Sequence, residues 1–356
     1  MKDWQKAALV YIGTVIGAGF ASGQEILRFF VVYGKESFWG IAISGVLFGL
    51  IVSCVLCKTY EKKIQGADEY YADIAGNTVT ALLNLVVSLF MFSSFCVMNA
   101  GSGALFNEQL NLPAWLGILV MCLLCAFIFL KDISGIVGLN SIFTPLMILG
   151  ILFLGAYVFV TKKTLHTLSC HGIFQNWFIS CMVYISYNTL TTVPVMSALG
   201  KLIHKKSDAI KAGVMCGITL FALSAVLWFV LSTRTKWSMQ LPILHAMAGI
   251  SKAANILYIP VLYIAMLTTA VSSGFGVIKT INARFNINGL FIIAVMCALA
   301  AIISLSGFSQ LVEKLYSLFG VAGLGVLVIV LIDGIKYLSI GKPRKSKEKR
   351  KKRSNY

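Results

Sequence analysis

The stretch 12–30, IGTVIGAGFASGQEILRFF, decides how the rest of the chain is interpreted. It lies in an apolar run long enough to span a membrane, yet it contains Gly13, Gly17, Gly19 and Gly23. Glycine costs roughly 1 kcal/mol per helical position relative to alanine, so four glycines predict a weak or broken helix. Backbone that is unwound at membrane depth survives only where protein or a water-filled cavity covers it. Its free peptide groups can then bind ions and small polar solutes.

The same glycines fit the small-xxx-small pattern of closely packed helices, so close packing is an alternative interpretation. Glu25 and Arg28 favour a functional site, because ionisable residues inside a membrane segment are rare and usually functional. Three positions apart on a helix, they are close enough to pair. We predict either an ion pair at an outer gate or, for Glu25, a carboxylate that carries a coupled proton. A charge pair that reaches the water interface is the third interpretation.

The run GTVIGAG at 13–19 resembles the broken first helix of the amino acid-polyamine-organocation transporter superfamily. The longer string GTVIGAGFASGQE resembles the YkvI family of bacterial membrane proteins, which is placed in that superfamily. The resemblance implies a LeuT-like fold with ten membrane-spanning helices in a five-plus-five inverted repeat, in which helices one and six are discontinuous. It says little about the solute.

Composition places the chain in a membrane and predicts an all-α polytopic protein. Hydrophobic residues make up 58% and charged residues 12%, with a mean hydropathy of +0.86. In soluble domains about a quarter of the residues are charged. Most of the nine cysteines lie in apolar runs without a nearby histidine, so we expect small buried side chains and no metal or redox cofactor. No catalytic or nucleotide-binding motif stands out, and we do not expect an enzyme.

Ten apolar runs are long enough to cross about 30 Å of hydrocarbon. They lie near 7–32, 38–57, 80–106, 113–130, 134–160, 172–199, 209–232, 253–280, 288–306 and 315–336. Five spans in each half insert the second half in the opposite sense, which makes an inverted repeat. We therefore divide the chain into a first repeat at 1–161, a second repeat at 162–340 and a polybasic tail at 341–356.

Lysine and arginine set the orientation. More of them fall on the side that holds the N-terminus, and residues 342–353 alone carry nine of the thirty. We expect a multi-pass protein of the bacterial cytoplasmic membrane with both termini in the cytoplasm. The net charge of +17 is then explained by topology and by a tail that lies on anionic lipid headgroups, and no nucleic-acid partner is expected.

The sixth run has an unusually polar centre that includes Tyr184, Tyr187, Asn188 and Thr189, followed by Pro194. Proline removes a backbone donor and crowds the carbonyl group four residues earlier. A simple kink is one interpretation. Interruption of the helix, matching the first helix, is the one we favour.

The eighth run carries hydroxyl groups on one helical face. In sodium-coupled members with the LeuT fold, one sodium lies between main-chain oxygens of the broken first helix and hydroxyls of helix eight. By resemblance, the ligands are the carbonyls of Gly13, Ile16 and Thr269 and the hydroxyls of Ser272 and Ser273. A slip of one turn brings in Ala265 and Thr268, and simple hydrogen bonding between helices is the alternative. The coupling ion is Na⁺ or H⁺.

We expect the solute site between the two breaks, with amides near Gly17 and Gly19 receiving a carboxylate at the positive end of a half-helix. By resemblance, the loop after helix seven, at 233–251, is expected to act as an outer lid. The candidate pocket residues are Gly17, Ala18, Gly19, Ser22, Ser93, Ser94, Met98, Asn99, Tyr184, Tyr187, Asn188 and Thr189.

These features predict an ion-coupled secondary transporter that moves a small amino-acid-like or related organic solute by alternating access. Its expected partners are the solute, the coupling cation and anionic lipid. The alternative is a nutrient-sensing membrane receptor that has a transporter fold and little or no flux.

Overall fold

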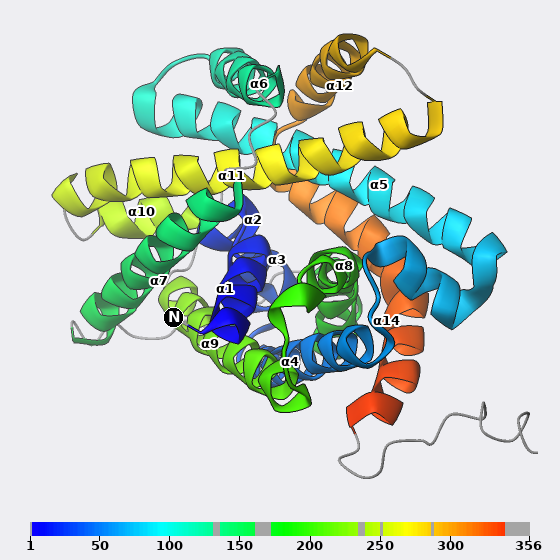
Figure 1. Cartoon of the computed structure of the whole chain (residues 1–356). Coiled ribbons are helices and arrows are strands. Elements are labelled where there is room, and N and C mark those ends of the chain that lie inside the picture. Colours follow the sequence, from blue (N-terminus) through cyan, green and yellow to red (C-terminus); the bar gives the residue numbers. More distant parts are fainter. Residues whose placement is uncertain are drawn as a thin grey trace, which may run out of the picture.

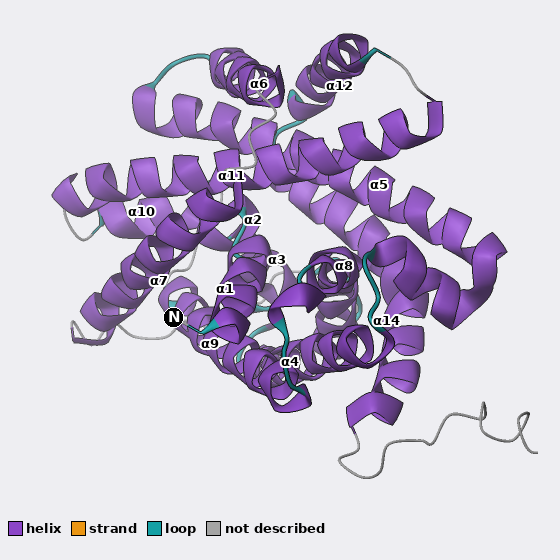
Figure 2. Cartoon of the chain, in the orientation of Figure 1, coloured by secondary structure: helices purple, strands orange, loops and turns teal. Residues whose placement is uncertain are grey.

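The computed structural model describes residues 2–130, 136–160, 172–233, 239–249, 252–285 and 288–338. Within these ranges every regular element is a helix and no strand is found (Figure 2). The predicted all-α class is therefore confirmed for the described part of the chain. The polybasic tail at 341–356 and the predicted boundary at 161–162 lie outside the described residues.

Fourteen α-helices follow one another along the described residues. Those of the first half are α1 (Asp3–Val15), α2 (Ala18–Ala21), α3 (Gln24–Phe29), α4 (Ser37–Lys62), α5 (Ala67–Leu110), α6 (Ala114–Leu130) and α7 (Ile136–Val160). Those of the second half are α8 (Trp177–Ala198), α9 (Lys206–Ser232), α10 (Pro242–Ala248), α11 (Lys252–Phe285), α12 (Gly289–Ser304), α13 (Phe308–Leu311) and α14 (Ser317–Leu338). A π-helical turn, Val312–Tyr316, joins the last two.

Five helical stretches within the described residues are long and apolar enough to cross a membrane. They are α4, Thr78–Leu110 of α5, α9, Lys252–Asn282 of α11, and Phe308–Leu338, which joins α13 to α14. Three shorter apolar helices accompany them, namely α6, Thr144–Val160 of α7, and α12. Five such stretches support a multi-pass membrane protein.

The first apolar run is divided into three short helices. α1 ends at Val15, and neither Ile16, with ψ 59°, nor Gly17, with ψ −173°, is helical before α2 begins. Gly23 takes φ +84°, a left-handed conformation that favours glycine, and α3 follows it. The interruption thus lies in the glycine-rich stretch, where backbone freedom is greatest.

The sixth predicted span is not interrupted. α8 passes through Asn188 without a break, so the predicted discontinuity there is wrong. Pro194 lies near the end of α8, where its missing N–H releases the carbonyl of Leu190 alone. The hydroxyls of Thr189 and Thr192 each donate to the carbonyl oxygen four residues earlier, at 2.8 Å. Because these polar side chains bond within their own helix, they do not open it.

The divided helix α1–α3 lies at the centre of the bundle (Figure 1). α4 and α9 pack together on one side of it, α5 and α11 cross on another, and α6 and α12 lie beyond them (Figure 1). α4 and α9 approach so closely that a Cβ atom on Gly49 would stand 3.0 Å from the carbonyl oxygen of Gly213. Small residues permit such backbone contact in membranes.

The bundle has two ends, and side-chain contacts identify them. Asp3 at the start of α1 lies 3.1 Å from His204, which precedes α9, and Lys206 at the start of α9 donates to Glu61 at the end of α4. We call this end the N-terminal side. The short helix α10 covers the opposite end of the divided helix, where the backbone N–H of Ile243 donates to the carbonyl of Ser22. We call that end the α10 side.

Candidate functional site

A cavity of about 60 Å³ lies at the break between α1 and α2. Side chains from α3, α5, α8, α11 and the π-helical turn complete its walls. A larger hollow of about 600 Å³ lies between α4 and α9, but side chains such as Val46 and Ile218 in its wall are more than half exposed. We interpret the larger hollow as a lipid-facing groove and the smaller cavity as the candidate site.

Glu25 is the single charged side chain among the described residues that line this cavity. It is 4% exposed, and its Oε2 atom accepts a hydrogen bond of 2.7 Å from the hydroxyl of Tyr187. Its Oε1 atom lies over Gly19, where a Cβ atom would stand 2.1 Å from that oxygen. Glycine at position 19 therefore allows the carboxylate to fold back over α2.

Three aromatic rings form one wall of the cavity. The ring centroids of Tyr187 and Tyr316 are 4.8 Å apart, and that of Phe90 is 5.9 Å from Tyr187 and 5.8 Å from Tyr316. Tyr316 closes the π-helical turn, a rare geometry that often occurs at functional sites. Each ring comes from a different helical segment, so the wall exists only in the folded bundle.

Hydroxyl groups of α11 form another part of the lining. Thr269 lies against the break, because its Oγ1 atom is 3.4 Å from the position of a Cβ atom on Gly17. Ser272 donates to the carbonyl of Thr268 at 2.8 Å, and Ser273 donates to the hydroxyl of Ser94 on α5 at 3.3 Å. The lone pairs of both serine oxygens can still face a cation.

The predicted ion ligands are largely gathered at this place. Gly13, Thr269, Ser272 and Ser273 all line the cavity. Ile16 does not line it and is buried in the core. The break therefore lies beside the hydroxyl-bearing residues of α11.

The predicted solute-binding residues divide into two groups. Gly17, Ser94, Tyr187 and Asn188 line the cavity. The predicted residues that do not line it are Ala18, Gly19, Ser22, Ser93, Met98, Asn99, Tyr184 and Thr189.

Local bonding and packing explain three of these corrections. Asn99 donates to the carbonyl of Phe95 at 2.8 Å and accepts a hydrogen bond from Cys122 on α6, so it serves the α5–α6 contact. The hydroxyl of Ser22 donates to the carbonyl of Gly19 at 3.1 Å. Tyr184 is fully buried among aromatic rings that include Phe29, Phe30 and Phe48.

Sequence reasoning missed five lining residues, namely Thr14, Val15, Phe90, Thr191 and Tyr316. Two of them had a local signal. Phe90 precedes Ser94 by four positions and Thr191 follows Tyr187 by four, and side chains at this spacing share one helical face. Tyr316 lies far from every predicted site residue in sequence and carried no such signal.

The predicted ion pair between Glu25 and Arg28 is wrong. Arg28 instead lies 3.2 Å from the carboxylate of Glu313 and donates to the hydroxyl of Ser309 at 2.8 Å. Glu25 turns inward to Tyr187, and Arg28 turns toward the segment between α13 and α14. The ion pair that does form joins the divided helix to the last helical segment on the α10 side.

The α10 side of the cavity is covered by polar contacts to the backbone. Gln24 donates to the carbonyl of Met239 at 3.1 Å, and the hydroxyl of Tyr258 donates to the carbonyl of Ala21 at 2.8 Å. The carboxylate of Glu108 on α5 accepts from the backbone N–H groups that precede α10. α10 therefore packs over the divided helix, in the place where the resemblance implied a lid.

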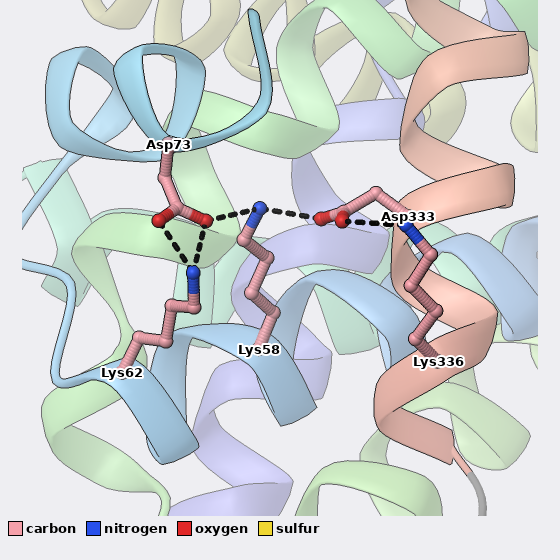
Figure 3. Close-up of polar contacts among 5 residues, drawn as sticks. All are labelled: Lys58, Lys62, Asp73, Asp333 and Lys336. Carbon is pink, nitrogen blue, oxygen red and sulfur yellow. Dashed lines mark hydrogen bonds and ion pairs between the residues drawn. The ribbon is translucent and has the colours of Figure 1, made fainter. Parts of the chain in front are cut away.

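A second polar cluster lies on the N-terminal side, and sequence reasoning missed it. Lys58 near the end of α4 is fully buried and lies between Asp73 on α5, at 2.8 Å, and Asp333 on α14 (Figure 3). Lys62 donates to Asp73 at 2.6 Å, and Lys336 lies 3.6 Å from Asp333. The sequence showed only a lysine at the end of a span, yet the five side chains tie three helices together.

Comparison with known proteins identifies what the chain is similar to. No protein-family model matches it. It is 26% identical over 329 residues to the uncharacterized membrane protein YkvI of Bacillus subtilis (strain 168), covering 91% of this chain and 94% of YkvI. It is 28% identical over 334 residues to the uncharacterized protein YyaD of the same organism, covering 92% and 96% of the two chains.

Solved structures identify the fold. MhsT in complex with L-phenylalanine superposes with a TM-score of 0.69 at 13% identity, over 95% of this chain and 92% of MhsT. A Na⁺-coupled sialic acid symporter gives 0.62 at 14% identity, over 93% and 79% of the two chains. Mhp1 in its inward-facing conformation gives 0.61 at 14% identity, over 93% and 76%. These are LeuT-fold transporters, so the chain has a LeuT-like fold.

Proposed function

We propose that the chain is a secondary transporter that moves a small organic solute across the bacterial cytoplasmic membrane by alternating access. One observation carries this proposal: a buried carboxylate lines a cavity at the point where the central helix is interrupted. Burying a charge is costly unless a partner or a ligand compensates it. An anchor or an enzyme scaffold has no need of this arrangement, whereas a translocation site does.

The same proposal includes ten spans in two inverted repeats. In it, α1–α3 form the first span, α4 to α7 complete the first repeat, and α8, α9, α11, α12 and α13–α14 form the second. Three pairs of counterpart helices support it, because α4 packs on α9, α5 on α11 and α6 on α12. A pseudo-twofold axis between repeats brings such counterparts together.

Alternating access requires one closed side and one side that can open. The α10 side is closed by the lid-like helix and by the pair of Arg28 with Glu313. Ser272 is exposed although it lines the cavity, and it lies well along α11, away from α10. We propose that the solute path runs past Ser272 to the N-terminal side. With both termini in the cytoplasm, this is the inner path, and the polybasic tail then lies on anionic headgroups.

For the coupling ion we propose Na⁺, held by the carbonyls of Gly13, Ile16 and Thr269 and by the hydroxyls of Ser272 and Ser273. Four of these five residues line one cavity, which supports the assignment. Neutral oxygen ligands suit an ion that must also be released. A proton carried by Glu25 is the second coupling candidate, favoured by the burial of that carboxylate beside the same oxygens.

The test is solute flux in liposomes that contain the purified chain and anionic lipid. Uptake is measured with an inward Na⁺ gradient, an inward H⁺ gradient or no gradient, and liposomes carrying Glu25→Gln serve as the matched control. We expect uptake above the control that collapses when one of the gradients is removed. Saturable binding without any flux under every gradient would instead favour a receptor.

A further inference from the structure

The charge of the cavity limits what can bind in it. Among the described lining residues there is no lysine, arginine or histidine, and Glu25 supplies the one formal charge. The nearest basic residue in sequence, Arg28, is engaged by Glu313 and Ser309. A buried carboxylate needs a countercharge, and no basic side chain of the described lining supplies it, so a bound cation must.

The position of Glu25 also excludes one common ligand group. Its Oε1 atom lies over Gly19, next to the amides where sequence reasoning placed a solute carboxylate. The carboxylate of the chain itself therefore occupies that place. A second carboxylate there would meet a like charge in a buried setting, which disfavours it.

The aromatic wall favours a cation. A cation within about 6 Å of a ring centroid is attracted by the negative face of the ring. The rings of Phe90, Tyr187 and Tyr316 lie within 5.9 Å of one another and line the same cavity as the carboxylate. Because Tyr187 also donates to Glu25, the rings and the charge are held as one unit.

The size of the cavity limits the ligand as well. A single water needs about 10–15 Å³ of such volume, so 60 Å³ accommodates about four to six groups of that size. The cavity, which the proposed Na⁺ site shares, therefore suits a ligand of a few heavy atoms and is too small for a peptide or a sugar.

We propose that the solute is a small organic cation, an amine whose ammonium group pairs with Glu25 and lies against the rings of Phe90, Tyr187 and Tyr316. This inference rests on the proposed function and narrows it from an amino-acid-like solute to an amine without a recognised carboxylate.

The test is ligand binding to the purified full-length chain in detergent, in potassium buffer with and without added sodium. The cationic probes are ethanolammonium and tetramethylammonium. Ethylene glycol and tert-butanol are their neutral counterparts of similar shape, and glycine is the zwitterion. We expect the two cations to bind and to raise the unfolding temperature. The neutral counterparts and glycine should do neither at the same concentration.

Variants identify the groups responsible. Glu25→Gln removes the charge, and we expect cation affinity to fall at least about tenfold. Tyr316→Leu removes one ring and should weaken cation binding about 30-fold. Tyr316→Phe keeps the ring, and we expect it to bind the cations more tightly than Tyr316→Leu does.

Several results overturn the inference. One is equal binding of tetramethylammonium and tert-butanol, and another is a cation affinity that Glu25→Gln leaves unchanged. A third is that sodium raises the unfolding temperature of the parent but not of Glu25→Gln, while no organic cation binds. If Glu25→Gln does not fold, equal affinities of Tyr316→Leu and Tyr316→Phe overturn it. Failure of the proposed function looks different, because amines would then bind without crossing liposome membranes. If liposomes take up glycine and no amine binds, the proposed transport function holds and the proposed amine solute is wrong.

Discussion

The hydroxyl of Tyr187 donates a hydrogen bond of 2.7 Å to the carboxylate of Glu25, across 162 residues of sequence. This bond joins α3 of the divided helix to the continuous helix α8. A hydrogen bond to a charged group contributes about 1.5–3 kcal/mol, enough to decide where a buried carboxylate points. The position of the charge in the cavity therefore depends on α8, even though that helix is not itself broken.

Tyr187→Phe removes the donor and keeps the ring. We expect the ligand affinity of the cavity to fall about tenfold or more, because the carboxylate loses the bond that orients it. Isothermal titration with the best-binding probe measures this. Tyr184→Phe is the matched control, since the Tyr184 hydroxyl is buried without a hydrogen-bond partner among the described residues. Equal losses in the two variants would show that Glu25 does not depend on Tyr187.

The pair of Arg28 with Glu313 predicts a gate on the α10 side. Both side chains are about one-third exposed, so the pair contributes no more than about 1 kcal/mol. In Glu313→Gln, the state that is open on the α10 side should therefore be about two- to fivefold more populated, and the protein should stay folded. The measurement uses Thr191→Cys, which puts a thiol in the cavity lining. An impermeant maleimide is added outside intact cells, and the rate at which it labels this thiol is followed. The charge swap Arg28→Glu with Glu313→Arg should restore slow labelling, and no change in either variant would rule out a gate here.

The break in the first helix was predictable because its cause is local. Gly23 takes a left-handed conformation that favours glycine, and the cluster of glycines around it is visible in the sequence. The unbroken α8 was not predicted, because the hydroxyls of Thr189 and Thr192 satisfy carbonyls of their own helix. Polar composition alone does not distinguish the two outcomes.

The spacing of residues in the sequence could not predict the contacts that complete the site. Glu25 and Arg28 are neighbours on one helix, yet each finds a partner more than a hundred residues away. Lys58 has the appearance of an interfacial lysine, and Tyr316 follows a polar turn near the last span. Their contacts form only when separate helices pack together, so no local sequence pattern predicts them.

Lys58 predicts a structural clamp on the N-terminal side. Removing one partner of a buried ion pair typically costs about 3–5 kcal/mol. Here each aspartate keeps a second lysine nearby, so we expect Lys58→Met to cost about 3 kcal/mol. Thermal unfolding in detergent measures this, with Lys336→Met, at an exposed position, as the control. The double variant Lys58→Met with Asp333→Met should recover most of the loss, and equal stability of Lys58→Met and the parent would contradict the clamp.

Asp73 predicts the acid sensitivity of the same cluster. Burial raises the pKa of its carboxyl, but hydrogen bonds from Lys58 and Lys62 outweigh this and hold the pKa below its usual value. The stabilisation is then complete above the unfolded pKa of about 3.9 and is lost as pH falls through the lower folded value. Unfolding temperatures between about pH 6 and pH 3 should fall more steeply for the parent than for Asp73→Asn. Lys62→Met removes one donor and should move the loss to higher pH, while identical pH profiles would show that Asp73 contributes nothing.

Ser272 and Ser273 predict the sodium dependence of uptake. Replacing both with alanine removes two hydroxyl ligands, and we expect the sodium concentration for half-maximal uptake to rise at least about tenfold. Flux in liposomes at a series of sodium concentrations measures it. Ser94→Ala is the matched control, because it removes the same bond between α5 and α11 while both α11 hydroxyls remain. If Ser94→Ala raises the sodium requirement as much as the double variant, the serines only hold the helices together. If the double variant keeps its sodium dependence and loses nothing, the cation lies elsewhere, and Glu25 with a proton becomes the coupling group to test.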